Sequence, residues 1–149
     1  MLRLGIGAWA VTVLALAGEF TFSLGSPVAS QDFRAKAAAF VFRTQGCADP
    51  AKSQISGTVE GLVKGTRRSL PLNVTTMSQP GVYAVYRTWP VEGEWVVSLK
   101  GTCTGVNAGA IVPIGPKGFI RESSKFFSRP ATDAEIEMAL KELTQGANK

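Results

Sequence analysis

The sequence EWVVSLKGTC, residues 94–103, decides the fold class of this chain. Its large apolar side chains and a cysteine fall on alternate positions: Trp95, Val97, Leu99 and Cys103. The other parity is taken by Val96, Ser98 and Lys100. Successive side chains of a β-strand point to opposite faces of a sheet, so this alternation predicts a strand. We expect Trp95 and Cys103 to face the same side, with the cysteine beside an aromatic core.

Further strands are predicted on both sides of this segment. Alternating or short apolar runs occupy residues 40–44, 54–63, 70–76, 82–89 and 110–114. Turn-forming residues separate these runs about every ten residues, which is typical of an antiparallel sandwich. Residues 106–109 are predicted as a loop, and residues 119–129 are compatible with a strand or a helix. The pattern predicts an all-β fold, an antiparallel β-sandwich of about seven short strands.

The clearest helix is predicted at the C-terminus, at residues 132–145. Thr132 and Glu135 have the spacing of a capping box. Apolar residues then follow the i, i+3, i+4, i+7 spacing of one helix face: Ile136, Ala139, Leu140 and Leu143. A lone helix of this length is marginal in water, so we expect this face to dock on the sheet.

The first thirty residues have the layout of a secretory signal peptide. Arg3 is followed by an uncharged apolar run, residues 6–17, and later by the small residues Val28-Ala29-Ser30. Cleavage is predicted after Ser30. The expected product is one domain, residues 31–149, that is secreted or periplasmic.

Two other interpretations of this leader remain open. The alternative cleavage site follows Ala17, at Ala15-Leu16-Ala17. The leader could also be retained as a membrane anchor, but Glu19 interrupts the apolar stretch before it reaches the roughly 20 residues of a span. After signal removal, we expect no transmembrane span in the rest of the chain.

Cys47 and Cys103 are the only cysteines of the chain. In an exported protein such a pair is typical of one structural disulfide. Redox pairs usually have the Cys-x-x-Cys spacing at a helix start, which these two cysteines lack. We therefore predict a Cys47–Cys103 disulfide that stabilises the domain by about 4 kcal/mol.

The composition excludes several classes of chemistry. The chain has 149 residues, a formal net charge of +5 and no histidine. Without histidine there is no Ser-His-Asp or Cys-His machinery, no HExxH zinc site and no histidine-ligated copper or haem. We expect no cofactor and no metal. For a basic exported protein, anionic lipid, polysaccharide or cell wall is a more natural partner than nucleic acid.

Two of the strands resemble a pattern found in small exported bacterial β-sandwiches. Gly81-Val82-Tyr83 begins one strand, and the stretch from Gly93 to Leu99 contains the glycine, Trp95 and alternating apolar residues of the next. Similar strands occur in modules of the FixH/YtkA type, the copper-resistance CopC type and carboxypeptidase-regulatory-like domains. The resemblance implies an immunoglobulin-like β-sandwich with a C-terminal α-helix. Only the fold is carried over, because this chain lacks the histidines of the copper-binding members.

The chain also departs from true immunoglobulin domains. Those domains place the core tryptophan on a strand between the two strands joined by the disulfide. Here Trp95 and Cys103 belong to one predicted strand.

Two groups of charged residues are candidate sites. Glu92 and Glu94 lie between Trp89 and Trp95, and paired carboxylates beside aromatic side chains can cleave or bind sugars. A second group could bind an anionic partner: Lys64, Arg67, Arg68, Arg121 and Lys125. If residues 119–129 were helical, basic residues spaced by four would form a stripe: Lys117, Arg121, Lys125 and Arg129. A solvated turn and solubilising surface charge are the simpler interpretations of the two groups.

These observations predict a function of a general class. We expect a non-catalytic, exported binding or accessory module of the bacterial cell envelope with a protein or anionic envelope partner. One alternative is a carboxylate-dependent hydrolase using Glu92 or Glu94. Another is an inhibitor-like protein that binds a second exported protein through a sheet edge.

Overall fold

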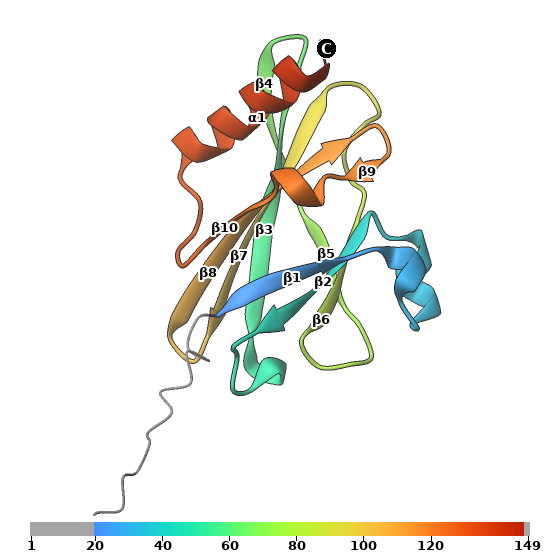
Figure 1. Cartoon of the computed structure of the whole chain (residues 1–149), viewed down its shortest axis with the longest axis vertical. Helices are drawn as coiled ribbons and strands as arrows, with labels where there is room; N and C mark the ends of the chain where they lie inside the picture. Colours follow the sequence, from blue (N-terminus) through green and yellow to red (C-terminus); the bar gives the residue numbers. More distant parts are fainter. Residues whose placement is uncertain (1–19, 148–149) are drawn as a thin grey trace, which may run out of the picture.

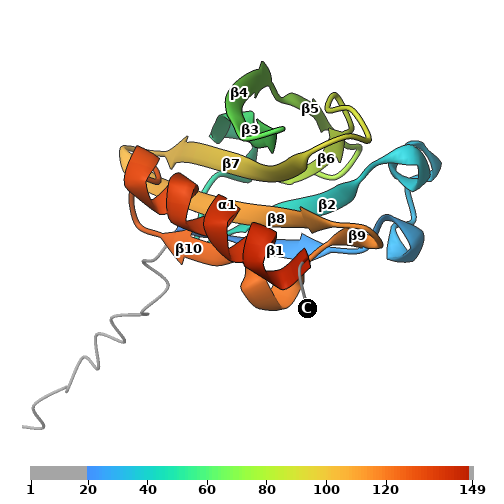
Figure 2. The same ribbon diagram turned by 90° about the horizontal axis from the view of Figure 1, so that it is seen from above.

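The computed structural model describes residues 20–147, which form two antiparallel sheets and one α-helix (Figures 1 and 2). Sheet A has the order β1-β2-β6-β5, with β1 at Thr21–Gly25, β2 at Phe40–Gln45, β6 at Val82–Tyr86 and β5 at Asn73–Thr76. Sheet B has the order β10-β8-β7-β3-β4, with β10 at Lys125–Phe127, β8 at Val106–Gly115, β7 at Glu94–Cys103, β3 at Gln54–Val63 and β4 at Thr66–Pro71. The short strand β9, Gly118–Phe119, pairs with β8. The predicted antiparallel β-sandwich is thus confirmed, with more strands than expected.

The core lies between the two sheets and is strongly aromatic. Sheet A and the residue before it contribute Phe20, Phe22, Phe40, Phe42 and Tyr83. Sheet B contributes Val59, Trp95, Val97, Leu99, Cys103 and Val112. The ring centroid of Phe42 is 5.4 Å from that of Phe22 and 5.2 Å from that of Tyr83, so aromatic contacts reinforce the burial. Trp95 and Cys103 face the same side of β7, as the alternation predicts.

Two-residue turns set the register of two hairpins in sheet B. Lys64-Gly65 joins β3 to β4, and Thr104-Gly105 joins β7 to β8. The φ angles are 51° and 76° in the first turn and 47° and 81° in the second, the twist-matched geometry of type I′ turns. Because the second turn is so tight, Val106 pairs with Cys103. The prediction of a loop at residues 106–109 is therefore wrong, since these residues begin β8.

Strand β1 lies inside the segment that the sequence analysis assigns to the leader. It pairs with β2 from Thr21↔Gln45 to Gly25↔Val41. Phe20 and Phe22 are only 3% and 4% exposed. The folded unit therefore begins before the predicted boundary at residue 31. A cut after Ser30 would remove β1 and both phenylalanines from the sandwich.

The remaining features of the leader lie outside the described residues. They are Arg3, the apolar run of residues 6–17 and the alternative cleavage site after Ala17. Within residues 20–147, no helix is long and apolar enough to cross a membrane.

Helix α1, Asp133–Ala147, covers the outer face of sheet B (Figure 2). The Thr132 Oγ1 accepts a hydrogen bond from the Glu135 N–H at 3.2 Å, and the Glu135 carboxylate accepts one from the Thr132 N–H at 2.9 Å. The predicted capping box therefore forms. The predicted apolar residues Ile136, Ala139 and Leu140 pack against Val96 and Ile111 of the sheet. The helix thus buries the part of the outer face around Val96 and Ile111, whereas Lys100 on the same face of β7 is exposed.

Residues 119–129, which are compatible with either structure in the sequence, form no α-helix. They contain the end of β9, the 3-10 helix η4 at Arg121–Ser123 and strand β10. Strand β10 pairs with β8 through Phe126↔Ala110. The basic side chains spaced by four residues therefore do not line up as a helical stripe.

Candidate functional site

The outer face of sheet A is only partly covered, by a segment that we call the strap, residues 27–38. The strap contains the 3-10 helices η1, Pro27–Ala29, and η2, Phe33–Ala37. Ala35 and Ala38 pack on Ala84 of β6 and on Met77. The Tyr86 hydroxyl donates a hydrogen bond of 2.8 Å to the Arg34 carbonyl oxygen. These contacts fix the strap over β6 and leave the part of the face near β1 open.

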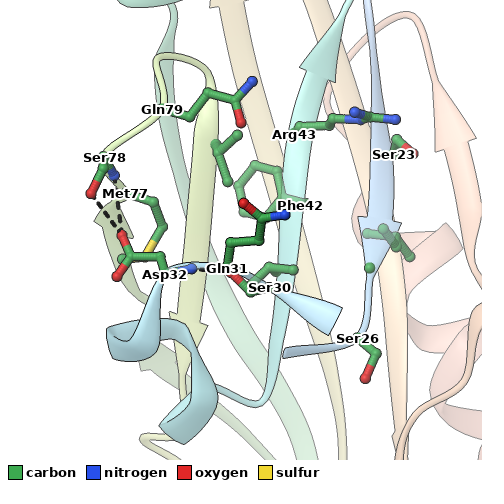
Figure 3. A pocket seen from close by; sticks show the side chains of 14 residues that line it. Ser23, Ser26, Ser30, Gln31, Asp32, Phe42, Arg43, Met77, Ser78 and Gln79 are labelled. Atoms are coloured by element: carbon green, nitrogen blue, oxygen red, sulfur yellow. Dashed lines mark hydrogen bonds between the residues drawn. The ribbon is translucent and has the colours of Figure 1, made fainter. Parts of the chain in front are cut away.

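A groove of about 700 Å³ lies beside the strap (Figure 3). Its lining comes from three stretches that are far apart in the sequence: residues 23–32, residues 41–43 and residues 77–82. Figure 3 shows Arg43 and Ser23 on one side, Gln31 across the middle, and Asp32 with Ser78 on the other side. The volume falls within the usual range of ligand-binding clefts.

The strand register builds the floor of this groove. Ser23 of β1 and Val82 of β6 both lie directly opposite Arg43 of β2. The neighbouring residues Leu24 and Phe42 belong to the core cluster, so the alternation of the strands directs this row outward. The row places a guanidinium group between a hydroxyl and an apolar side chain at the centre of the open face.

The two charged side chains of the groove differ in their partners. The Asp32 carboxylate accepts hydrogen bonds from the Arg34 guanidinium at 2.9 and 3.1 Å and from the Ser78 hydroxyl at 2.9 Å. The Arg34 guanidinium, and then Ser78, hold the pKa of Asp32 well below its usual range. The Arg43 guanidinium makes no hydrogen bond or ion pair with any other described residue.

A second hollow of about 740 Å³ lies between the end of α1 and the β8–β9 turn. Its lining is mainly apolar, with prolines, Ile114, Ile120 and Leu143, and it includes Glu94. The Thr144 hydroxyl donates a hydrogen bond to the Glu94 carboxylate. Glu92 does not line this hollow, and its carboxylate lies 3.6 Å from the Lys64 ammonium in an exposed pair. The two glutamates that the sequence places side by side therefore engage different partners.

The five predicted basic residues do not form one patch. Arg67 lies between the sheet and α1, with its guanidinium 3.5 Å from Glu60, 3.0 Å from Asp133 and 3.6 Å from Glu137. The Lys125 ammonium pairs with Glu142 of α1 at 3.2 Å. These two residues hold α1 on the sheet.

The other three basic residues lie apart from them. Arg121 donates a hydrogen bond of 3.1 Å to the Leu24 carbonyl oxygen. Lys64 pairs with Glu92, and Arg68 is exposed on the edge strand β4. Within the described part of the chain, no three potential metal ligands come together.

The predicted disulfide between Cys47 and Cys103 is present, with a Cα–Cα distance of 5.8 Å. Cys47 follows β2 of sheet A, and Cys103 is the last residue of β7 in sheet B. The bond therefore joins the two sheets, and Cys103 is buried in the core between them.

Sequence reasoning missed the groove because it assigned β1 to the leader. The alternation of Phe20, Phe22 and Leu24 with Thr21 and Ser23 was a usable signal for this strand. No comparable signal marks the groove itself, since its three stretches meet only through the pairing of β1, β2 and β6. Comparison of the chain with protein-family models, curated proteins and solved structures finds no match.

Proposed function

We propose that this protein is a non-catalytic, exported binding or accessory module of the bacterial cell envelope, and that the groove on sheet A is its binding face. One observation carries this proposal. The groove gathers polar side chains from three stretches, and several of them, including Arg43, Gln31 and Gln79, make no side-chain hydrogen bond to another described residue. Exposed polar side chains that gather in one groove and are not used within the fold are available to bind a ligand.

The proposed fold is an immunoglobulin-like sandwich, and the strand order supports it. If β1 to β8 are lettered A, B, C, C′, D, E, F and G, sheet A has the order A-B-E-D and sheet B contains C′-C-F-G. These are the strand orders of immunoglobulin-type sandwiches. The disulfide also joins the ends of the B and F strands. The position of Trp95 on F remains a departure from antibody domains.

Export is part of the proposal and is supported by the disulfide, which persists in oxidising compartments. Of the two cleavage sites, the one after Ala17 is compatible with the fold, because it leaves Phe20 and β1 in the mature chain. The site after Ser30 would remove one edge strand of sheet A.

The hydrolase alternative has weaker support. A carboxylate pair that cleaves a sugar flanks one bond, at separations of about 5–10 Å across a cleft. The Glu94 carboxylate accepts a hydrogen bond from the Thr144 hydroxyl of α1. Glu92 pairs with Lys64 in the β3–β4 turn and does not line the hollow. The sheet-edge alternative meets a different obstacle in β4, because Pro71 at its end lacks an N–H group for pairing.

Co-sedimentation with purified bacterial cell-wall and outer-membrane fractions tests the proposal. We expect the wild-type protein to sediment with one of these fractions and to release no soluble fragments from it. Ser23→Trp fills the groove and should abolish sedimentation, whereas Thr66→Trp on the exposed edge strand β4 is the matched control and should not. Equal sedimentation of both variants would show that the groove is not the binding face. Released sugars or peptides would favour the hydrolase.

A further inference from the structure

The groove contains one positive charge, that of Arg43, for which the described residues provide no acidic partner. Asp32 and Arg43 are the only charged residues in its lining. Asp32 is neutralised by Arg34, which does not line the groove. Arg43 has no acidic partner among residues 20–147. A ligand with a negative charge would supply the missing partner.

The geometry around Arg43 suits a carboxylate. The guanidinium group is a planar fork of donors that matches a carboxylate with two parallel hydrogen bonds. Arg43 stands on β2, which is paired on both sides by β1 and β6, so the backbone that carries the fork is held in place. A fixed backbone reduces the entropy that is lost when the ligand binds.

The other polar groups of the groove are hydroxyls and amides. They are the side chains of Ser23, Ser26, Ser30, Gln31, Ser78 and Gln79. Strand β2, in the middle of the floor, pairs with β1 on one side and β6 on the other, so its backbone groups are committed to the sheet, whereas β1 is an edge strand. Over β2, recognition therefore depends on side chains, which donate to and accept from hydroxyl groups equally well. This favours a saccharide as the ligand that lies over β2 and contacts Arg43, because an extended peptide would pair with free backbone groups at a sheet edge.

We propose that the groove binds an acidic saccharide, with the Arg43 guanidinium holding the carboxylate of a uronic acid unit and Gln31, Gln79 and Ser23 binding its hydroxyl groups. This inference rests on the proposed function, because it names the ligand of the same groove. Val41 and Val82 also line the groove, and their apolar side chains would contact the ring carbons of the sugar.

Isothermal titration with oligogalacturonate, and with its fully methyl-esterified form, tests this inference. The ester keeps the hydroxyls and loses the charge, so it should bind about 10- to 100-fold more weakly, the value of one charge-assisted contact. Arg43→Gln should weaken oligogalacturonate binding by a similar factor and leave binding of the ester unchanged. Arg43→Lys keeps the charge but loses the planar fork of donors. Its affinity for oligogalacturonate should lie between that of the wild type and that of Arg43→Gln.

A matched control separates this contact from general charge attraction. Lys100→Gln removes one exposed positive charge from sheet B and should leave the affinity within about twofold of wild type, since screening is strong beyond about 10 Å. Equal losses in Lys100→Gln and Arg43→Gln would overturn the inference, as would equal binding of acid and ester. Tighter binding of an acidic peptide than of the saccharide would also overturn it.

The outcome for the proposed function can be read separately. If wild-type protein sediments with an envelope fraction, and Ser23→Trp does not, but oligogalacturonate fails to bind, the saccharide inference falls and the binding module stands. If the wild-type protein neither sediments with an envelope fraction nor binds oligogalacturonate, both the proposed function and the saccharide inference are wrong.

Discussion

The two sheets of this sandwich have outer faces that are covered in different ways. On sheet B, helix α1 packs Ile136, Ala139 and Leu140 into a dry contact with Val96 and Ile111. On sheet A, the strap covers part of the face with two small alanines and leaves a groove beside them. The first cover comes from an amphipathic helix at the end of the chain, and the second from a short irregular segment between two strands.

The comparison separates charged groups that contact one another within the fold from those that we propose to bind a ligand. Arg67 and Lys125 of sheet B form ion pairs with Asp133 and Glu142 of α1. The charged side chains on that side therefore hold the helix on the sheet. On the strap side the carboxylate of Asp32 pairs with Arg34, and Arg43 has no acidic partner among residues 20–147. The groups that we propose to bind a ligand therefore lie on the face that the strap covers only in part.

The largest effect is expected from removing the edge strand beneath the open face. A chain that begins at Gln31 lacks Phe20 and Phe22, and each buried phenylalanine contributes about 3–5 kcal/mol. The loss is comparable to the whole stability of a domain, so this chain should not fold. A chain that begins at Gly18 should fold. Circular dichroism melting distinguishes them, and equal melting temperatures would show that β1 is dispensable.

Replacing Cys47 and Cys103 by serine should give the next largest loss. The bond closes a loop with a sequence separation of 56 residues and joins the two sheets. The chain-entropy model then gives about 4 kcal/mol, which chemical denaturation would measure. Reduction of the wild-type protein should reproduce the loss. An unchanged denaturation midpoint would mean that the two sheets need no covalent link.

The helix cover should respond to a single truncated side chain. Leu140 is 1% exposed, and Leu140→Ala should cost about 3 kcal/mol through lost burial and the cavity left behind. Met138, on the same helix, is 58% exposed, and Met138→Ala should cost less than about 0.5 kcal/mol. Equal costs would indicate that α1 does not seal the sheet as described.

The strap should show a smaller dependence on its contacts. Tyr86→Phe removes the hydrogen bond to the Arg34 carbonyl oxygen, at an expected cost of about 0.5–1 kcal/mol. Limited proteolysis within residues 27–38 should accelerate in this variant. If Tyr86→Phe destabilises the protein as much as Leu140→Ala does, the strap is held as strongly as the helix and the comparison between the two covers is wrong.

The smallest effect concerns the pH dependence of the helix cap. The Arg129 guanidinium, helped by the Thr132 N–H, lowers the pKa of Glu135 to about 2. A lowered pKa means that this carboxylate stabilises the folded state above its ordinary pKa and loses that contribution as pH falls towards 2. Carboxyl-carbon NMR should give a midpoint near 2 for Glu135. Arg129→Met should raise the pKa of Glu135. An unchanged pKa in this variant would show that Arg129 is not the cause of the shift.

The sequence predicts those elements whose signals are local. The alternation around Trp95 and the capping box at Thr132 act within one strand and one helix turn, and both are found in the structure. The start of β8 is not predicted from the sequence, because Ala108 and Gly109 are small and do not continue an alternation of apolar and polar residues. Gly109 is small because the Arg129 carbonyl oxygen lies against its backbone. Such a contact joins residues far apart in sequence.

The groove escapes prediction for a related reason. Arg43 looks like an ordinary polar residue of a half-buried strand, and its importance depends on which side chains lie opposite it. Those partners belong to β1 and β6, and β1 was hidden by the resemblance of its surroundings to a cleavable leader. The basic residues that the sequence does single out are used largely for helix docking and turn contacts.

The edge strand β4 has a consequence for solubility. An edge strand can add to the sheet of a second molecule and start an ordered aggregate. Here that strand carries Arg68, which is exposed, and ends at Pro71. Two copies brought together along β4 would place like charges side by side, and the proline offers no N–H to continue the ladder. Thr66–Pro71 therefore disfavour pairing of two copies along this edge of sheet B.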